Sequence, residues 1–452
     1  MFQNNKILIL GFARSGYEAA KLLINRGNVV ILNDAKMEEQ QDSDKIRELR
    51  ELGVQFVFGS HPDDLLDSSF DYLIKNPGVP IDHKYVLTAK KLGIEVINEV
   101  EMAYRLLPAG VTLVGITGTN GKTTTTTLTY NILHNAFGNR VVLAGNIGFP
   151  LSSVLKDIHE DTILVMEVSC QQGENFKDFH PHIGVITNFS EAHIDFMKTY
   201  EHYKEVKARM FYKQAEDDIA ILNYGNDDVM KELDGIVSKK KYFTSKEKCN
   251  GCHLVDRDIF YYDQRIMSID DIKIKGMHNV ENCMAAIMVA KEFDVSDDII
   301  TSTISNFKGV EHRLEYVDTV NGVEYYNDTE ATNIKCTQIA LSSFDRPVIL
   351  FLGGLERGQD FSELTSYMKH VKAVIAIGQC RDRVADYAKA ISKDVYVYEH
   401  LKDGFDKASS IAKENDVVLL SPASASWDQY KECEVRGKEF KDKVQELKIS
   451  MK

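Results

Sequence analysis

A glycine-rich loop between an apolar strand and a threonine-rich helix start constrains the fold of this chain more than any other feature. The loop reads Gly115-Ile116-Thr117-Gly118-Thr119-Asn120-Gly121-Lys122-Thr123. It follows the apolar run at 112–116. Glycines in such a loop let backbone N–H groups converge on phosphate oxygens at a helix start. The loop is one residue longer than the strict Walker spacing, but its context favours a nucleotide-phosphate site over a turn with an incidental lysine.

Lysine and hydroxyl side chains at the end of this loop suit the chemistry of ATP. Lys122 is expected to neutralise the β and γ phosphates, and the hydroxyl of Thr123 or Thr124 to reach Mg²⁺. ATP and Mg²⁺ are therefore the predicted cofactors. The residues of this loop expected to bind ATP are Gly118, Thr119, Asn120, Gly121, Lys122, Thr123 and Thr124.

The N-terminal segment has the pattern of a βαβ unit. Apolar runs at 6–10 and 29–32 flank a turn at 11–16 and a helical stretch at 17–25. The turn lacks the middle glycine with which dinucleotide folds approach a pyrophosphate. Asp34, at the end of the second run, is placed to accept a hydrogen bond from a ribose or a base. A modified nucleotide site is therefore predicted here, with a purely structural turn as the alternative.

The chain is too long for one hydrophobic core. It has 452 residues, whereas single cores stop growing near ~250–300 residues. Alternating strand-like and helical runs predict an α/β protein of three domains. These are a Rossmann-like domain at 1–98, a P-loop ATPase-like central domain at 99–308 and a Rossmann-like domain at 309–452.

One part of the central domain departs from this alternation. Residues 242–274 contain short alternating runs typical of antiparallel hairpins. Cys249 and Cys252 have the spacing of a metal knuckle, but no second Cys/His pair lies near them in the sequence. We therefore expect Asn250 and Gly251 to form a hairpin turn.

Charge and composition exclude several classes of protein. The formal net charge of −14 argues against nucleic acid or an anionic membrane as a partner. No apolar run approaches the roughly 18 residues of a membrane span. Seven cysteines, an odd number, suit reduced thiols. We expect a cytoplasmic monomer whose partners are small molecules.

Beyond the phosphate loop, further segments resemble the Mur ligase family over essentially the whole chain. In the central part they are Gly145-Asn146-Ile147-Gly148, Glu167-Val168-Ser169, Thr187-Asn188 with His193 and Asp195, Lys207, and Gly276-Met277-His278-Asn279-Val280-Glu281-Asn282. In the last third they are Glu311-His312-Arg313, Asn327-Asp328, Ala331-Thr332-Asn333, the glycine turn at 353–358 and Leu420-Ser421-Pro422-Ala423-Ser424-Ala425-Ser426-Trp427-Asp428.

The resemblance implies an ATP-dependent amide ligase of peptidoglycan precursor synthesis, from the branch of the family that adds D-glutamate to UDP-N-acetylmuramoyl-L-alanine. In such a reaction ATP converts a carboxylate into an acyl phosphate, and an amine then displaces phosphate. This chemistry requires cations around the transferring phosphoryl group rather than a protein nucleophile. We therefore expect no catalytic serine or cysteine.

The resemblance also implies roles for individual residues. The catalytic residues would be Lys122, Lys207 and His193, with Lys207 carbamylated, and the metal ligands Thr123, Glu167, His193 and Lys207. ATP would further contact Asn282, Arg313 and Asp328. The UDP-linked precursor would contact Arg14, Ser15, Asp34, Gly78, Asn146, Ser169 and Gln172. D-Glutamate would contact Thr332, Arg357, Ser426 and Trp427.

Two departures from the family pattern keep other functions open. Glu330 stands where the family has lysine, and Thr329 where it has serine; residues 169–173 also lose an aromatic and an apolar side chain. These changes favour a catalytically impaired member that binds nucleotides in a regulatory or scaffold role. A folate polyglutamate synthase is a third possibility, against which Asp34 and the turn at 75–78 argue.

Overall fold

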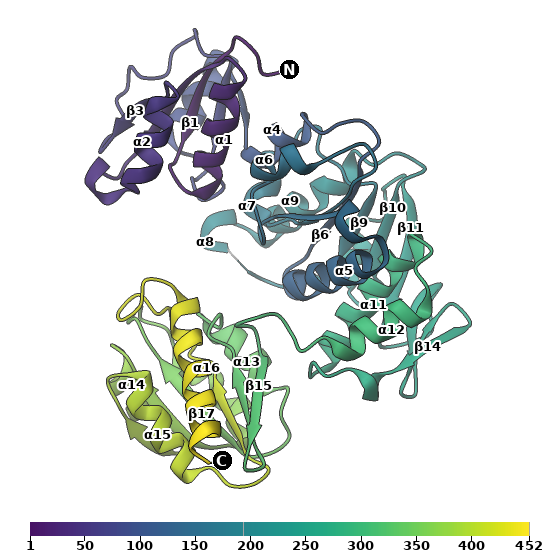
Figure 1. Ribbon diagram of the computed structural model, residues 1–452, viewed down its shortest axis with the longest axis vertical. Helices are drawn as coiled ribbons and strands as arrows, with labels where there is room; N and C mark the ends of the chain where they lie inside the picture. The colour runs from purple at the N-terminus through teal and green to yellow at the C-terminus, as the bar shows by residue number, and fades with distance from the viewer. Residues whose placement is uncertain (193, 452) are drawn as a thin grey trace. The chain divides into compact units, whose positions relative to one another are not determined.

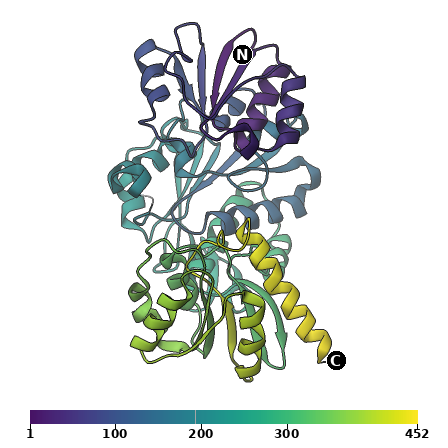
Figure 2. The same cartoon turned by 90° about the vertical axis from the view of Figure 1, so that its left-hand side faces the viewer.

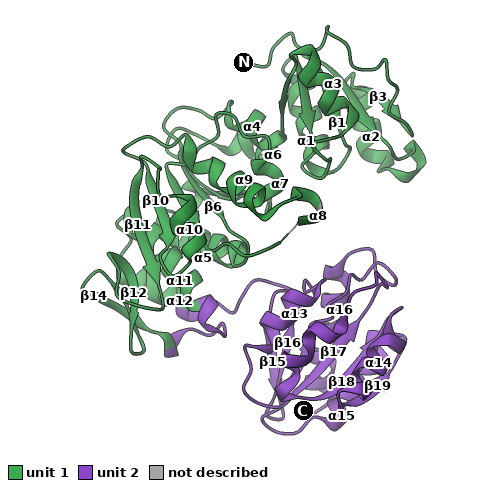
Figure 3. Cartoon of the chain, turned by 180° about the vertical axis from the view of Figure 1, so that it is seen from behind, with its two compact units in different colours: residues 1–269, 280–304 green, residues 270–279, 305–452 purple. Residues whose placement is uncertain are grey.

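A computed structural model describes residues 1–192 and 194–451 and divides the chain into two compact units (Figure 3). Unit 1 comprises Met1–Ile269 and Val280–Ile304. Unit 2 comprises Asp270–Asn279 and Ser305–Lys452. Within the described residues, no helix is long and apolar enough to cross a membrane.

Unit 1 begins with a five-stranded parallel sheet in the order β3-β2-β1-β4-β5 (Figure 1). Its strands are β1 (Lys6–Leu10), β2 (Val29–Asp34), β3 (Gln55–Phe58), β4 (Tyr72–Lys75) and β5 (Glu95–Ile97), and its helices α1 (Arg14–Asn25), η1 (Glu38–Gln40), α2 (Ser43–Glu51) and α3 (Lys84–Leu92). Ile7 and Ile9 pack with α1 and α2, while Leu8 and Leu10 pack with α3. Side chains alternate between the faces of a strand, so both faces of this sheet are covered.

The rest of unit 1 is built on a nine-stranded sheet in the order β14-β13-β12-β11-β10-β9-β6-β8-β7. Its strands are β6 (Thr112–Thr117), β7 (Val141–Gly145), β8 (Ile163–Glu167), β9 (Ile183–Ile186), β10 (Ile219–Asn223), β11 (Lys239–Thr244), β12 (Gly251–Val255), β13 (Asp258–Tyr261) and β14 (Gln264–Ser268). The strands from β7 to β12 pair in parallel, and β12 to β14 pair antiparallel.

Most of the helices around this sheet connect its parallel strands. The helices are α4 (Glu99–Tyr104), α5 (Lys122–Phe137), η2 (Gly138–Arg140), α6 (Leu151–Val154), η3 (Leu155–Asp157), α7 (Cys170–Gly173), α8 (Ile194–Met197), α9 (Tyr200–Tyr212), α10 (Asp227–Glu232), η4 (Ile269–Asp271), α11 (Met277–Glu292) and α12 (Asp297–Asn306). Helix α4 precedes the first of the parallel strands, while η4, α11 and α12 follow β14. The beginning of α11 and the end of α12 belong to unit 2.

Unit 2 contains a six-stranded sheet in the order β15-β16-β20-β17-β18-β19, parallel except for the β15–β16 hairpin. The strands are β15 (Glu315–Val320), β16 (Val323–Asn327), β17 (Val348–Gly353), β18 (Val371–Ile377), β19 (Asp394–Val397) and β20 (Val417–Leu420). The helices are α13 (Ile334–Leu341), η5 (Phe361–His370), α14 (Arg381–Ala390), α15 (Leu401–Ile411) and α16 (Cys433–Ser450).

Both faces of the unit 2 sheet are buried. Leu350 of β17 packs in a core with α13, η5 and α14, while its neighbour Phe351 packs in a second core with α15 and α16. The long yellow helix that reaches the C-terminus in Figure 2 is α16. A strand buried on both faces reads as a continuous apolar run, which is why β17 was recognisable in the sequence.

The α/β class is confirmed, but two local predictions were wrong. Asn250 and Gly251 do not form a hairpin turn, because β11 and β12 pair in parallel and Gly251 begins β12. The hairpin turns lie instead after β12 and β13, where Asp256 and Tyr262 adopt positive φ angles of 53° and 54°. Helix α1 also begins at Arg14, three residues before the predicted start at 17.

Candidate functional site

The phosphate loop joins β6 to α5 in unit 1. Gly118 and Gly121 have φ angles of 139° and 83°, where a residue with a Cβ is strained. A Cβ at Gly121 would also collide with the side-chain amide of Asn282, and one at Gly118 with the Thr187 hydroxyl. These glycines let the loop pass close to its neighbours, and Gly121 lies next to the first turn of α5. An anion at this helix start would be stabilised by exposed N–H groups and the helix dipole.

Hydrogen bonds from a neighbouring strand end hold the loop in place. The backbone N–H of Thr119 donates to the Asn188 carbonyl over 2.8 Å, and that of Asn120 donates to the Asn188 side chain over 3.0 Å. The Tyr203 hydroxyl of α9 donates to Thr119 Oγ1 over 3.0 Å. Asn282, a predicted ATP contact, accepts from the Thr125 hydroxyl over 3.2 Å. The structure therefore brings the loop and Asn282, both predicted to contact ATP, close together.

Two lysines approach this loop from different helices. Lys122 Nζ donates to the Thr119 carbonyl over 2.9 Å, while Lys207 Nζ of α9 donates to the Gly118 carbonyl over 2.7 Å. Lys207 is 3% exposed, and burial, reinforced by the charge of Lys122, lowers its pKa to about 7. An unshifted lysine, with a pKa near 10.4, has only about one neutral amine in 2,500 at pH 7. Lys207 therefore offers the neutral amine that reaction with CO₂ requires.

Glu167 lies at the end of β8, the strand next to β6, which leads into the phosphate loop. It is 1% exposed, and its Oε1 accepts from the Asn146 side chain over 2.6 Å. Its Oε2 is buried and has no hydrogen-bond partner among the described residues. A buried carboxylate oxygen without a partner is costly unless a cation or donor faces it. Carboxylate and hydroxyl oxygens are the ligands that Mg²⁺ prefers, so Glu167 and the hydroxyls of Thr123 and Thr124 fit that ion.

His193, the remaining predicted metal ligand, lies outside the described residues. The side chains of Thr123 and Thr124, in the first turn of α5, are partly exposed. Cys170 is buried beside this group, and burial raises the pKa of its thiol, which is the wrong direction for a nucleophile. Burial therefore does not activate the Cys170 thiol as a nucleophile.

The candidate precursor residues of the first sheet gather at the carboxyl ends of β1, β2 and β4. The Asp34 carboxylate accepts the backbone N–H of Phe12 over 2.7 Å and that of Lys36 over 2.9 Å. The Asn76 side chain donates to the Ser15 hydroxyl over 3.0 Å and accepts the Gly78 N–H over 3.1 Å. Ligands of open parallel sheets bind at this edge. Asp34 therefore also has a structural role, in that it shapes the turn carrying Arg14 and Ser15.

The other candidate precursor residues belong to the nine-stranded sheet. The Ser169 hydroxyl accepts the backbone N–H of Gln172 and so caps the short helix α7. The Gln172 side-chain oxygen in turn accepts the Ser169 N–H over 2.9 Å. Asn146, exposed after β7, holds Glu167 as described above. The segment that departs from the family pattern thus keeps a satisfied capping box, and Gln172 orients Ser169.

Sequence reasoning missed Lys75, the last residue of β4. Its side chain is fully buried, and its ammonium group donates to the carbonyls of Val79 over 2.6 Å and Asn76 over 3.3 Å. Burial lowers its pKa to about 8. Lys75 therefore fixes the loop that carries Gly78. The sequence marked the turn at 75–78 but gave no role to the Lys75 side chain.

The candidate nucleotide residues of unit 2 lie on two segments that are bonded together. Asp328 is buried, which raises its pKa to about 7, and its carboxyl accepts from the Ser421 hydroxyl over 2.7 Å. It also accepts the backbone N–H of Leu314 over 3.0 Å. The N–H of Glu330 donates to the His312 carbonyl over 3.1 Å. The loop that carries Arg313 is therefore fastened to the segment after β16.

Glu330, the reversed charge, does not lie unpaired. Its Oε2 is 3.5 Å from Nη2 of Arg313, with 27% and 45% of the two side chains exposed. Arg313 is the residue expected to reach the nucleotide. Glu330 therefore positions and partly neutralises that guanidinium, which the sequence alone did not indicate.

The candidate D-glutamate residues follow the carboxyl ends of three adjacent strands, β16, β20 and β17. The guanidinium of Arg357 lies 4.7 Å from the ring centroid of Trp427, which is 64% exposed. Ser426 is 1% exposed, and its hydroxyl has no partner among the described residues. Thr332 is partly exposed after β16. A cation and a hydroxyl with spare hydrogen-bonding capacity suit the binding of a carboxylate.

A second residue that sequence reasoning missed, Arg436 of α16, supports this edge. It is 1% exposed, and its guanidinium donates to Thr329 Oγ1 over 2.9 Å and to the Ser424 carbonyl over 3.1 Å. Burial lowers its pKa to about 10, so it stays charged at neutral pH. Arg436 ties the loops after β16 and β20 together.

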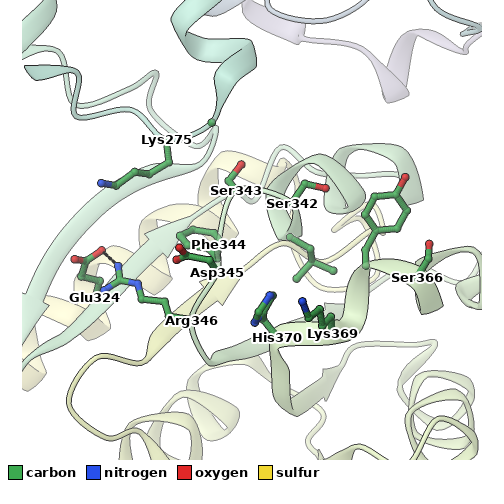
Figure 4. A pocket seen from close by; sticks show the side chains of 13 residues that line it. Lys275, Glu324, Ser342, Ser343, Phe344, Asp345, Arg346, Ser366, Lys369 and His370 are labelled. Carbon is green, nitrogen blue, oxygen red and sulfur yellow. Dashed lines mark hydrogen bonds and ion pairs between the residues drawn. The ribbon is translucent and has the colours of Figure 1, made fainter. Parts of the chain in front are cut away.

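Unit 2 also has a cavity of about 810 Å³ away from these residues (Figure 4). Arg346, two residues before β17, and His370, directly before β18, line it, so the cavity lies at the amino ends of these strands. Arg346 is occupied by an ion pair with Glu324. The candidate substrate residues lie at the opposite edge of the sheet.

Known protein families match this chain over most of its length. Family models match three successive segments: the Mur ligase MurD-like N-terminal domain at 5–98, the Mur ligase middle domain at 116–290 and the Mur ligase glutamate ligase domain at 312–424. The UDP-N-acetylmuramoylalanine--D-glutamate ligase of Streptococcus agalactiae serotype Ia is 43% identical over 449 residues, which cover 99% of this chain and 98% of the relative. The chain belongs to the Mur ligase family. The corresponding ligase of Enterococcus hirae is 42% identical over 457 residues, covering 99% of this chain and 97% of the relative.

Solved structures agree on the fold. UDP-N-acetylmuramate-alanine ligase MurC from Thermotoga maritima has a TM-score of 0.61 at 17% identity, covering 98% of this chain and 99% of the other. MurF ligase from Thermotoga maritima, solved in complex with ADP, has a TM-score of 0.58 at 18% identity, covering 98% and 96%. At these identities the likeness concerns the three-domain α/β architecture alone.

Proposed function

We propose that this Mur ligase uses ATP to join D-glutamate to the carboxylate of UDP-N-acetylmuramoyl-L-alanine in peptidoglycan precursor synthesis, with the cytoplasm as the expected location. The match at 41–43% identity over nearly the full length of ligases named for this reaction carries the proposal. The regulatory alternative is not favoured, because this match to ligases extends over nearly the full length of the chain. The monomeric state stays a prediction.

The proposal assigns one task to each predicted domain. Residues 1–98 bind the UDP-linked precursor, residues 99–308 bind ATP, and residues 309–452 bind the amino acid. Lys122 and the N–H groups of the phosphate loop hold the phosphates, and Lys122 follows the γ-phosphoryl group during transfer. Before transfer, the hydrogen bond to the Thr119 carbonyl holds Lys122 close to the phosphates. During transfer this hydrogen bond must break.

Chemistry proceeds in two steps. The precursor carboxylate attacks the γ-phosphorus, which releases ADP and forms an acyl phosphate. The amine of D-glutamate then attacks the acyl carbon, and phosphate leaves while the amine loses a proton. Positioned cations stabilise the charge that develops on the transferring group. Arg357 and Ser426 would hold the carboxylates of the incoming D-glutamate.

Glu167 and Lys207 would hold Mg²⁺ together with the Thr123 hydroxyl and His193. Glu167 has the unpartnered buried oxygen, and Lys207 would supply an oxygen ligand as a carbamate, formed when its amine adds to CO₂ and releases a proton. When bound, Mg²⁺ neutralises phosphate charge. Carbamylation of Lys207, its role and that of His193 are part of the proposal.

The proposed function is tested by phosphate release from ATP in the presence of UDP-N-acetylmuramoyl-L-alanine, with and without D-glutamate. We expect sustained release only when both are present, together with a ligated product seen by mass spectrometry. L-Glutamate is the matched control and should support little turnover. Absence of product with D-glutamate, in protein that binds ATP, would exclude the proposed reaction and favour a regulatory role.

Glu330→Lys tests whether the reversed charge is accommodated. The substitution removes an exposed ion pair with Arg313, worth up to about 1 kcal/mol, and adds a repulsion of similar size. A loss of about 2 kcal/mol corresponds to a fall of roughly thirtyfold in kcat/KM for ATP. Steady-state assays measure kcat/KM for ATP in both proteins. Glu363→Lys, at an exposed position of η5, is the control. Higher activity in Glu330→Lys would mean that the glutamate impairs the enzyme instead.

A further inference from the structure

A cavity of about 470 Å³ lies inside unit 1, between its first sheet and its nine-stranded sheet. One wall comes from α3 and β5, and the other from residues 174–177 and from Arg209 of α9. None of its lining residues belongs to the proposed precursor, ATP or metal contacts. Small-molecule sites in proteins commonly enclose roughly 300–1,000 Å³, so this cavity is large enough for a ligand.

One residue that lines this cavity, Asn175, has a buried acceptor without a donor. Asn175 is 8% exposed, and its Oδ1 has no hydrogen-bond partner among the described residues. Buried polar atoms in proteins nearly always have a partner, since an unpaired one costs about 1–3 kcal/mol. The Asn175 side chain would therefore gain a hydrogen bond by turning toward an occupant that offers an N–H or O–H group.

The charges around the cavity that remain unpaired are positive. Its two carboxylates have partners: Glu95 pairs with Arg105 over 2.7 Å, and Glu174 pairs with Arg209 over 3.7 Å. Lys90 and Lys177 also line the cavity, and neither has an anionic partner among the residues the structure describes. In a chain with a net charge of −14, two unpaired lysines on one cavity favour an anion there.

Apolar side chains from both walls make up much of the remaining lining. Val86, Ile94 and Val96 line it from the first sheet and α3, and Phe176 lines it from the other side. All four are buried. Apolar side chains of this kind gain stability when they cover the apolar body of a ligand.

We propose that this cavity binds a small amphipathic carboxylate. Its apolar body would lie against Val86 and Phe176, its anionic group near Lys90 and Lys177, and an N–H donor at Asn175. The site is separate from the proposed reaction. Because the ligand contacts both parts of unit 1, its binding also raises the melting temperature by mass action.

Calorimetric titration of the full chain with N-acetyl-L-phenylalaninate tests the proposal. This probe carries an aromatic ring, a carboxylate and one amide N–H. We expect saturable binding to one site with a Kd at or below about 1 mM, equivalent to roughly −4 kcal/mol. The neutral N-acetyl-L-phenylalaninamide should bind at least about tenfold more weakly, since it cannot pair with the lysines.

Variants locate the binding. Lys90→Met combined with Lys177→Met should weaken binding of the carboxylate about tenfold or more, while Lys91→Met, an exposed neighbour that does not line the cavity, should leave it unchanged. Asn175→Leu should also weaken binding. Equal affinity of the double variant, equal affinity for the neutral amide, or no binding up to about 10 mM would each overturn the proposal and leave a water-filled crevice only.

Discussion

Lys207→Ala is expected to abolish ligation while the protein remains folded. The substitution removes the buried amine that we propose becomes a carbamate ligand for Mg²⁺ next to the phosphate loop. Loss of such charge stabilisation costs several kcal/mol, so turnover should fall on the order of a thousandfold or more. Phosphate release and product formation measure the effect. Lys213→Ala, an exposed lysine just beyond α9, is the matched control and should retain activity.

Chemical rescue separates a ligand role from a packing role. Alanine at 207 leaves space beside Gly118, whose carbonyl accepts from Lys207 Nζ over 2.7 Å. Formate or acetate can enter that space and supply an anionic oxygen ligand, so activity should return in part with increasing carboxylate. Chloride at equal ionic strength should not restore it. Full activity of Lys207→Ala without added carboxylate would contradict the carbamate role.

The fold class and the position of the phosphate loop were predictable because both depend on local patterns. Buried parallel strands such as β17 are continuous apolar runs in the sequence. The glycine spacing at 115–123 indicates a phosphate loop without any information from the rest of the chain. Strand order was not predictable. The parallel pairing of β11 with β12 joins residues whose alternation resembles that of a hairpin, so the pattern alone led to the wrong pairing.

The supporting residues of the site were the least visible in the sequence. Arg436 bonds to Thr329 across 107 positions, which no motif reports. The turn at 75–78 was recognised, but not that buried Lys75 holds it through the Val79 carbonyl. The role of Glu330 was hidden in the same way. The sequence showed only a reversed charge, whereas in the structure Glu330 forms an ion pair with Arg313, 17 positions earlier. Motifs identify groups that touch a substrate, while the residues that position those groups emerge only from long-range contacts.

Lys122→Ala is expected to lower turnover by at least roughly a hundredfold, on the order of 3 kcal/mol of transition-state stabilisation. In the ligand-free loop, Lys122 donates to the Thr119 carbonyl over 2.9 Å. Loss of this bond should change the melting temperature little, because the N–H groups of Thr119 and Asn120 still hold the loop to Asn188.

The same variant distinguishes transfer from binding. Because the lysine follows the γ-phosphoryl group, kcat should fall far more than the affinity for ADP, which lacks that group. Single-turnover kinetics and ADP titration measure the two quantities, and Lys156→Ala, an exposed lysine of η3, is the control. Near wild-type turnover in Lys122→Ala would refute the assignment of the loop. Equal losses in kcat and ADP affinity would instead mean that Lys122 acts on the phosphates that ADP retains.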